Sequence, residues 1–147
     1  MIIIDSSVIF KWFNATEEFH LQAKALLKQH LLKNNEILIP TLLLYEITNA
    51  WATKTKLDEK DIKDNLKRLE KYSLKMIPIN FTLLKTAAGF SKKYRVSVYD
   101  ATYAVIAEEK KCDLITADDK FADKINLQFV KKLSTIPNTD IIHLDPA

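Results

Sequence analysis

The apolar run Ile2-Ile3-Ile4, followed at once by Asp5, is the feature that most constrains the fold of this chain. Three successive β-branched residues, with no polar residue between them, indicate a strand that is buried on both faces. Strands of that kind belong to parallel sheets that carry helices on both sides. The start of the chain therefore favours an α/β fold.

The rest of the sequence alternates between short strands and helices. Further strands are predicted at about residues 36–39, 76–79, 113–116 and 139–144. Helices are predicted at about residues 16–33, 41–55, 80–94, 98–110 and 121–133, the last with a break point at Asn126, and one more begins after a capping Asp58. The alternation predicts a three-layer α/β/α sandwich with a mostly parallel central sheet of about five strands. Ligands of such sheets bind beyond the carboxyl ends of the strands.

Length and composition narrow the class of protein. A chain of 147 residues, of which 48% are hydrophobic, is expected to form one domain over residues 1–147. The only glycine, Gly89, excludes the glycine-rich loops that cradle nucleotide phosphates. The only cysteine, Cys112, fits a reducing compartment, and neither a leader peptide nor a membrane span is expected, so we predict a cytoplasmic protein. The net charge of +3 permits contact with a polyanion without demanding it.

Four of the 19 acidic residues stand where a solvated surface charge is not expected. Asp5 directly follows the first strand, and Asp118 stands just beyond the strand predicted at residues 113–116. Glu46 and Asp100 are spaced at helical intervals from apolar residues, which places each on the core-facing side of a helix. Each acid alone has an ordinary explanation, as a helix cap or as the partner of an arginine. Together they suggest a shared site at the strand-end crevice.

A divalent metal ion is the partner that four such acids would require. A buried carboxylate is costly without a cation, and arginine, the side chain best suited to buried ion pairs, occurs only at Arg68 and Arg95. Mg²⁺ and Mn²⁺ prefer oxygen ligands, and on carboxylates they serve phosphoryl chemistry. The three histidines show no zinc-ligand spacing.

The same residues resemble the motifs of the PIN-domain nucleases, in particular the VapC-type toxins of toxin–antitoxin pairs, over essentially the whole chain. Residues 2–9 (IIIDSSVI) resemble the first strand and first acid of that family, and residues 43–47 (LLYEI) its helix-borne glutamate. Residues 99–104 (YDATYA) resemble the third acidic motif, and residues 114–118 (LITAD) with Phe121 the closing strand and fourth acid. Each motif is weak alone, but four in order are a strong signal.

The resemblance implies a metal-dependent endoribonuclease that cleaves RNA, holds Mg²⁺ or Mn²⁺, forms a homodimer and is bound by a cognate antitoxin protein. The roles that it implies are metal binding by Asp5, Asp100 and Asp118, metal binding or orientation of the attacking water by Glu46, and positioning of these acids by Ser7 and Thr116. Two alternatives stay open. One is a PIN-domain ribonuclease of RNA processing or decay, and the other is a catalytically inert PIN-like binding module, which need not retain all four acids.

Two local expectations complete the sequence analysis. Because Asp119 follows Asp118, the fourth acid is ambiguous: we expect Asp118 to point into the crevice with little effect on stability, and Asp119 to cap the next helix. The aromatic residues Trp12, Phe13 and Trp51 are expected to complete the core, or in part to line a groove for a partner helix.

Overall fold

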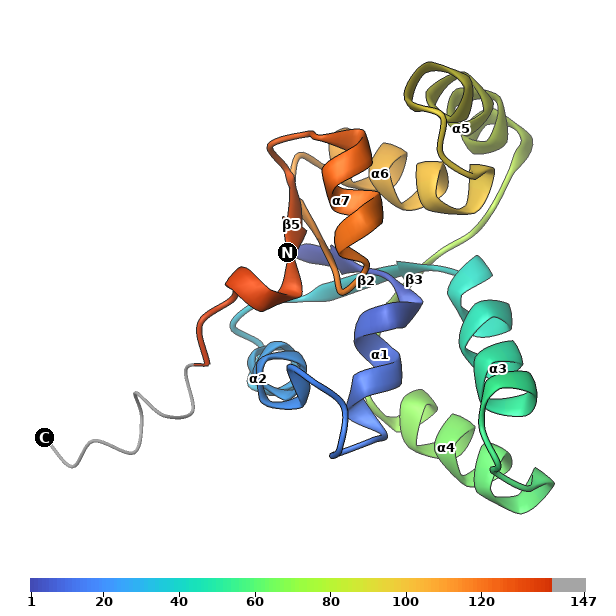
Figure 1. The fold of residues 1–147 in the computed structure, drawn as a ribbon, viewed down its shortest axis with the longest axis vertical. Helices are drawn as coiled ribbons and strands as arrows, with labels where there is room; N and C mark the ends of the chain where they lie inside the picture. Colours follow the sequence, from blue (N-terminus) through green and yellow to red (C-terminus); the bar gives the residue numbers. More distant parts are fainter. Residues whose placement is uncertain (139–147) are drawn as a thin grey trace, which may run out of the picture.

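A single parallel sheet organises the protein, as the computed structural model of residues 1–138 shows (Figure 1). Its five strands have the order β3-β2-β1-β4-β5, and all neighbours are parallel. The strands are β1 (Ile2–Ile4), β2 (Ile37–Pro40), β3 (Lys75–Ile77), β4 (Asp113–Thr116) and β5 (Val130–Lys132). The helices are α1 (Ser6–Trp12), α2 (His20–Leu31), α3 (Leu42–Lys54), α4 (Glu59–Lys71), α5 (Phe81–Tyr94), α6 (Val98–Lys110), α7 (Asp119–Ile125) and the short 3-10 helix η1 (Leu133–Thr135).

The helices form a layer on each face of the sheet, so the predicted α/β/α sandwich is confirmed for the described residues. Helices α1 to α4 lie on one face and α5 to α7 on the other (Figure 1). The chain proceeds outward from β1 to β3 and then returns to place β4 on the other side of β1. The strand order therefore reverses between β1 and β4, and open α/β sheets bind ligands at such a point, beyond the carboxyl ends of the strands.

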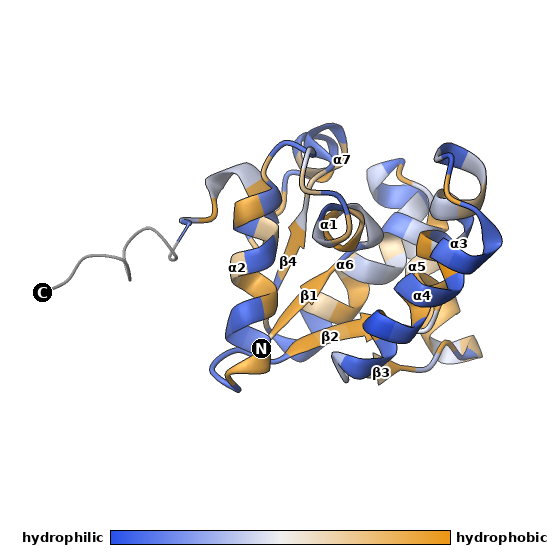
Figure 2. Cartoon of the chain, turned by 90° about the horizontal axis from the view of Figure 1, so that it is seen from below, coloured by the Kyte–Doolittle hydropathy of each residue, from blue (hydrophilic) through white to orange (hydrophobic). Residues whose placement is uncertain are grey.

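The central strands are buried, as the apolar run at residues 2–4 predicts. Every side chain of β1 and β2 is buried, and Ile3 pairs with Leu38 on one side and with Leu114 on the other. Figure 2 shows these apolar strands at the centre of the molecule, between helices with polar outer faces. Helix α6 is buried from Ala101 to Ala107 because it packs on β1, β2 and β4. This packing fixes the position of the first turn of α6 relative to the sheet.

Side-chain caps fix the start of several helices where the sequence predicts them. Asp58 accepts a hydrogen bond from the Asp61 N–H at 2.8 Å and forms a capping box with it at the start of α4. Asn80 and Ser97 cap α5 and α6 by accepting the N–H of Leu83 and of Asp100, respectively. Helix α6 has the bounds that were predicted. No helix within residues 1–138 combines the length and apolar character needed to cross a membrane.

The C-terminal part departs from the prediction. The helix predicted at residues 121–133 is wrong beyond Ile125, because Asn126 adopts a left-handed φ of 48° that ends α7. The chain then forms β5, in which Val130 pairs with Leu114. Helix α1, directly after Asp5, was not predicted. The strand predicted at residues 139–144 lies outside the described residues.

Candidate active site

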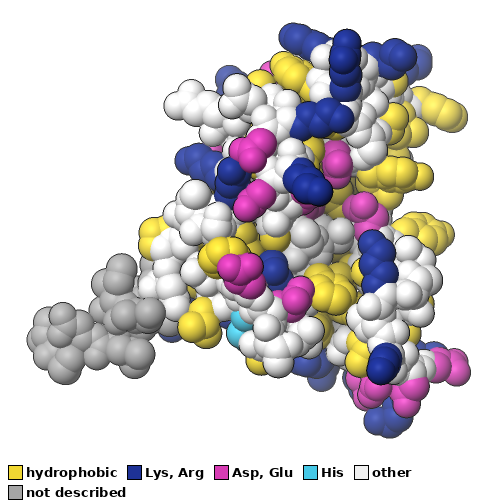
Figure 3. Space-filling view, viewed as in Figure 1, with side chains coloured by type: hydrophobic (Ala, Val, Ile, Leu, Met, Phe, Trp, Pro, Cys, Tyr) yellow, Lys and Arg dark blue, Asp and Glu magenta, His cyan; other side chains and the backbone are white. Residues whose placement is uncertain are grey.

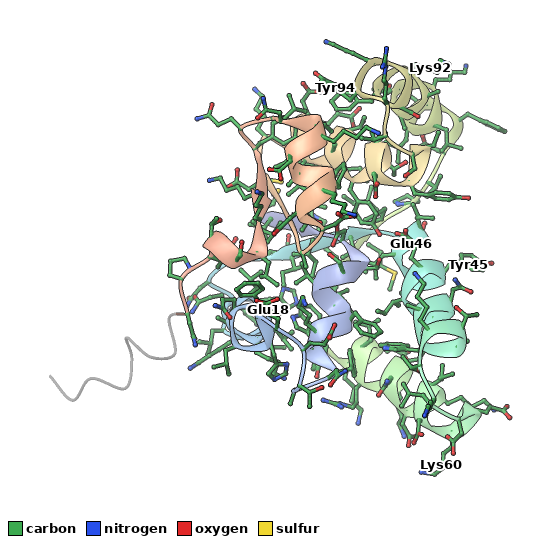
Figure 4. All side chains as sticks on the ribbon, viewed as in Figure 1. Glu18, Tyr45, Glu46, Lys60, Lys92 and Tyr94 are labelled. Carbon is green, nitrogen blue, oxygen red and sulfur yellow. The ribbon has the colours of Figure 1, made fainter. Side chains whose placement is uncertain are left out.

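The topology brings the four predicted acids to one edge of the sheet. Asp5 follows β1 and Asp118 follows β4, and these two strands are parallel neighbours. Helix α6 leads into the start of β4, so its first turn, which carries Asp100, lies at the opposite, carboxyl edge. Glu46 lies near the start of α3, which begins just beyond β2. Figure 4 shows Glu46 directed from α3 into the body of the molecule, whereas the adjacent Tyr45 points away from it.

Two hydroxyl groups hold the carboxylate of Asp5, which is only 7% exposed. Ser7 donates from its backbone N–H at 3.1 Å and from its hydroxyl to Oδ1, and Thr116 donates from Oγ1 to Oδ2 at 2.5 Å. The same hydroxyl oxygens accept backbone N–H groups of the chain that follows β4, from Ala117 at 2.9 Å and from Asp118 at 3.0 Å. The network joins the ends of β1 and β4 and orients Asp5.

Tyr103 is a site residue that the sequence analysis did not assign. Its hydroxyl donates to Oε1 of Glu46 at 2.5 Å. Burial, with the charge of Glu46, holds the pKa of Tyr103 far above its usual range, so this hydroxyl stays a proton donor. The only signal for it in the sequence is its position one turn after Asp100 on the same helix face. Its partner depends on how α6 and α3 are placed relative to each other.

The carboxyl group of Asp5 is harder to ionise than that of an exposed aspartate. Burial raises the pKa of Asp5 from 3.8 to about 6, although the two hydroxyl hydrogen bonds oppose this shift. The negative charges of Asp100 and Glu46 raise this pKa further. These contributions show that the three carboxylates lie within electrostatic range of one another.

The other two partly buried acids show the same pattern. Burial raises the pKa of Glu46; the hydrogen bond from Tyr103 opposes the shift, the charge of Asp100 adds to it, and the charge of Lys54 lowers it. Burial also raises the pKa of Asp100, and the charge of Asp118 adds to that increase. The acids thus destabilise one another's charged forms, and a bound cation would offset this repulsion.

The chemistry of these donors fits a hard divalent cation. All are carboxylate oxygens, and none of the four acids forms an ion pair within residues 1–138. The described residues do not, however, include a group of three or more histidine, cysteine or acidic side chains arranged to hold a metal ion. The structure therefore brings the carboxylates into electrostatic range without forming a coordination sphere.

Asp118, and not Asp119, caps α7. Its Oδ1 accepts the N–H of Phe121 at 3.0 Å, and Asp119 is the first residue of the helix. The expectation that Asp119 would cap this helix was wrong, because the helix begins earlier than predicted. The cap also leads us to expect that Asp118 contributes to stability, contrary to the sequence-based expectation. Asp118 is exposed, yet its charge reaches Asp100. It thus combines a cap with a position beside the other acids.

Comparison with known protein families is decisive for the class of protein. The profile of the PIN domain family matches residues 2–126, a range that includes all four acids. The chain belongs to the PIN domain family. The family that the motifs resemble is therefore confirmed. No curated protein matches the sequence significantly.

Solved structures share the fold of this PIN domain at low sequence identity. PAE2754 from Pyrobaculum aerophilum has a TM-score of 0.70 at 18% identity, covering 97% of this chain and 89% of that one. VapC20 from Mycobacterium tuberculosis, described as a sarcin–ricin loop cleaving toxin, has a TM-score of 0.67 at 16% identity, covering 88% and 97%. A toxin–antitoxin complex from Klebsiella pneumoniae has a TM-score of 0.59 at 15% identity, covering 83% and 90%. At these identities the similarity establishes the fold alone.

Large aromatic residues complete the core of the PIN domain behind the site, as expected. Trp12 and Trp51 are 2% and 1% exposed, and the indole N–H of Trp12 donates to the carbonyl of Ala23 at 2.7 Å. Phe13 packs edge-on against Trp51, with ring centroids 5.0 Å apart. Phe13 and Trp51 also line a cavity of about 360 Å³ together with Phe10.

Proposed function

We propose that this PIN domain is a metal-dependent endoribonuclease that hydrolyses RNA phosphodiester bonds and acts as the toxin of a toxin–antitoxin pair, with residues 1–147 as one domain. The observation that carries the proposal is the convergence of four carboxylates, none of them ion-paired within residues 1–138, at the carboxyl edge of β1 and β4. Membership of the PIN family supports nuclease chemistry. VapC20 and the Klebsiella complex support the toxin role and an antitoxin partner, through a shared fold.

The four acids would have different roles in the site. Asp5, Asp100 and Asp118 would bind Mg²⁺ or Mn²⁺ directly or through water, and Glu46 would bind the ion or orient the attacking water. A bound ion lowers the pKa of a coordinated water and neutralises the charge that builds on the phosphate. Tyr103 holds Oε1 of Glu46 in a fixed direction, which leaves Oε2 to accept from a water.

Two residues would position the acids. Ser7 and Thr116 each hold one oxygen of Asp5, so the carboxylate cannot rotate freely. Hydrogen bonds of this kind around metal ligands commonly fix their orientation and tune their affinity. Each hydroxyl also anchors the backbone just beyond β4, which sets the position of Asp118 relative to Asp5.

Cleavage of labelled RNA by the purified protein tests the nuclease function. We expect cleavage with Mn²⁺ or Mg²⁺ and none with EDTA, and we expect Asp5→Asn, Glu46→Gln and Asp100→Asn each to abolish cleavage while circular dichroism stays unchanged. The matched control is Glu108→Gln, which alters an exposed acid near the other end of α6. Full activity in Asp5→Asn or Asp100→Asn would contradict the site assignment.

The toxin role needs a test of its own, because a ribonuclease of RNA processing would use the same chemistry. Induced expression of the wild type should arrest growth, and Asp100→Asn should not. A short reading frame for a small DNA-binding protein directly upstream is the expected source of the antitoxin, and its co-expression should restore growth. Cleavage in vitro without growth arrest would favour the processing role.

Exposed apolar side chains support the proposed homodimer. Large hydrophobic side chains are exposed on α3, α5 and α6: Tyr45, Phe81, Leu84, Val98 and Tyr99. Tyr45 and Phe81 are 83% and 84% exposed, and Figure 3 shows hydrophobic side chains along the right-hand margin of the molecule. Exposed apolar surface of this kind marks interaction sites. Light scattering should give a dimer mass for the wild type and a monomer mass for Phe81→Asp, and a monomeric wild type would refute the dimer.

A further inference from the structure

A cavity beside the four acids is lined by two lysines as well as by two acidic residues. Its volume is about 360 Å³. Its lining includes Ser7, Ala117 and Asp118, which belong to the acidic edge, and also Lys11 from α1 and Lys54 from α3. The cavity therefore continues directly from the candidate site. Neither lysine forms an ion pair with any of the four site acids within residues 1–138.

Lys54 is aligned with the acid on its own helix. Glu46, Ala50 and Lys54 follow one another at intervals of one turn, so they share a face of α3, and the last two line the cavity. The charge of Lys54 acts on Glu46, so the two lie within electrostatic range. Lys54 is exposed and makes no ion pair within residues 1–138, which leaves its ammonium group accessible to an anion in the cavity.

Lys11 is more deeply buried than Lys54. Its side chain is 13% exposed, and its ammonium group lies 3.8 Å from Oε1 of Glu17, at the outer limit of an ion pair. Glu17 lines the same cavity. The ring Nδ1 of His20 lies 2.5 Å from the Lys11 carbonyl, which ties the end of α1 to the start of α2. Lys11 thus presents a mostly buried stem and one long, weak ion pair to the cavity.

We propose that this cavity binds the phosphate adjoining the scissile one in an RNA substrate, with Lys11 and Lys54 as positioning residues. The proposal rests on the nuclease function proposed above. Four carboxylates repel a polyanion, so a strand approaches them more readily where fixed cations offset the repulsion. Lysine binds phosphate as a point charge, and phosphate contacts set the register of a strand without reading its sequence. Glu17 would compete with that phosphate for Lys11.

Kinetics of single-stranded RNA cleavage test the proposal. Lys11→Met and Lys54→Met keep an apolar stem and remove the charge, so each should raise KM several-fold and change kcat little. Each should also reduce the slope of log affinity against log salt by about 0.7, the value for one phosphate contact on a single strand. Lys92→Met is the matched control, because Lys92 is exposed near the end of α5, far from Glu46 (Figure 4). It should leave KM unchanged.

The acid in the cavity provides the opposite test. Glu17→Gln removes the competitor for Lys11 and should lower KM, whereas Glu18→Gln, at the exposed neighbouring position, should not. Cleavage with wild-type KM and salt dependence in both lysine variants would overturn the phosphate site and leave the nuclease function standing. If the wild type cleaves no RNA, the nuclease function fails, and RNA binding measured by fluorescence anisotropy decides the phosphate site. Weaker binding in both lysine variants alone would support it, and equal binding in all variants would overturn it.

Discussion

Asp5→Asn should change how the stability of the protein depends on pH. Burial raises the pKa of Asp5 to about 6 in the folded state, from the ordinary value of 3.8 that applies to the unfolded chain. Between these values only the folded state holds the proton. The stabilisation is therefore fully present below the unfolded pKa and is lost as the pH rises through 6. At about 1.4 kcal/mol per pKa unit, the total loss is about 3 kcal/mol.

The asparagine variant lacks this pH dependence because its amide stays neutral. It also keeps an oxygen that can cap α1, as Asp5 does through the Ser7 N–H. The free energy of unfolding of Asp5→Asn, relative to the wild type, should therefore increase by about 2 kcal/mol between about pH 4.5 and pH 7.5.

Urea unfolding in the presence of a chelator, at both pH values, measures this difference. Carboxyl groups that lie far from Asp5 occur in both proteins, so their contributions cancel. Glu108→Gln should follow the wild type. At the higher pH, Mg²⁺ or Mn²⁺ should then stabilise the wild type more than Asp5→Asn, because a ligand that binds only the folded state stabilises it by mass action. A difference in free energy of unfolding between wild type and variant that is the same at both pH values would refute the raised pKa. Equal stabilisation of both proteins by the metal ion would remove Asp5 from the metal site.

Two further predictions concern the other residues of the site. Asp118→Ala should lose the cap of α7, at a cost of about 1 kcal/mol, and also abolish cleavage, whereas Asp119→Ala should retain both the stability and the activity. Urea titration with an RNA cleavage assay checks this pair, and the reverse pattern would move the fourth acid to Asp119. Tyr103→Phe removes a hydrogen bond that lowers the pKa of Glu46, so the acid limb of the kcat/KM profile should move to higher pH. An unchanged profile would exclude Tyr103 from the site.

Local sequence patterns predicted many of the elements because they depend on neighbouring residues. The run at Ile2–Ile4 became the buried central strand, and the capping Asp58 begins α4 as expected. The helix predicted at residues 121–133 is confirmed up to Ile125, with the predicted break at Asn126, and is wrong only beyond it, where apolar residues fit either a helix or a strand. There the left-handed Asn126 ends the helix, and the pairing of Val130 with Leu114 makes the following residues a strand. Leu114 belongs to β4, which lies outside the local sequence window.

The sequence by itself determined which acids are unusual, because the pattern of neighbouring residues already shows a carboxylate beside a buried strand or on an apolar helix face. It also determined the alternation that makes the sheet parallel. Only the tertiary structure decided what those acids contact. Thr116 meets Asp5 across 111 positions of the chain, and Tyr103 meets Glu46 across 57. Neither pairing follows from local propensity, because each exists only once the order β2-β1-β4 has set the end of β4 beside the end of β1 and α6 across from α3.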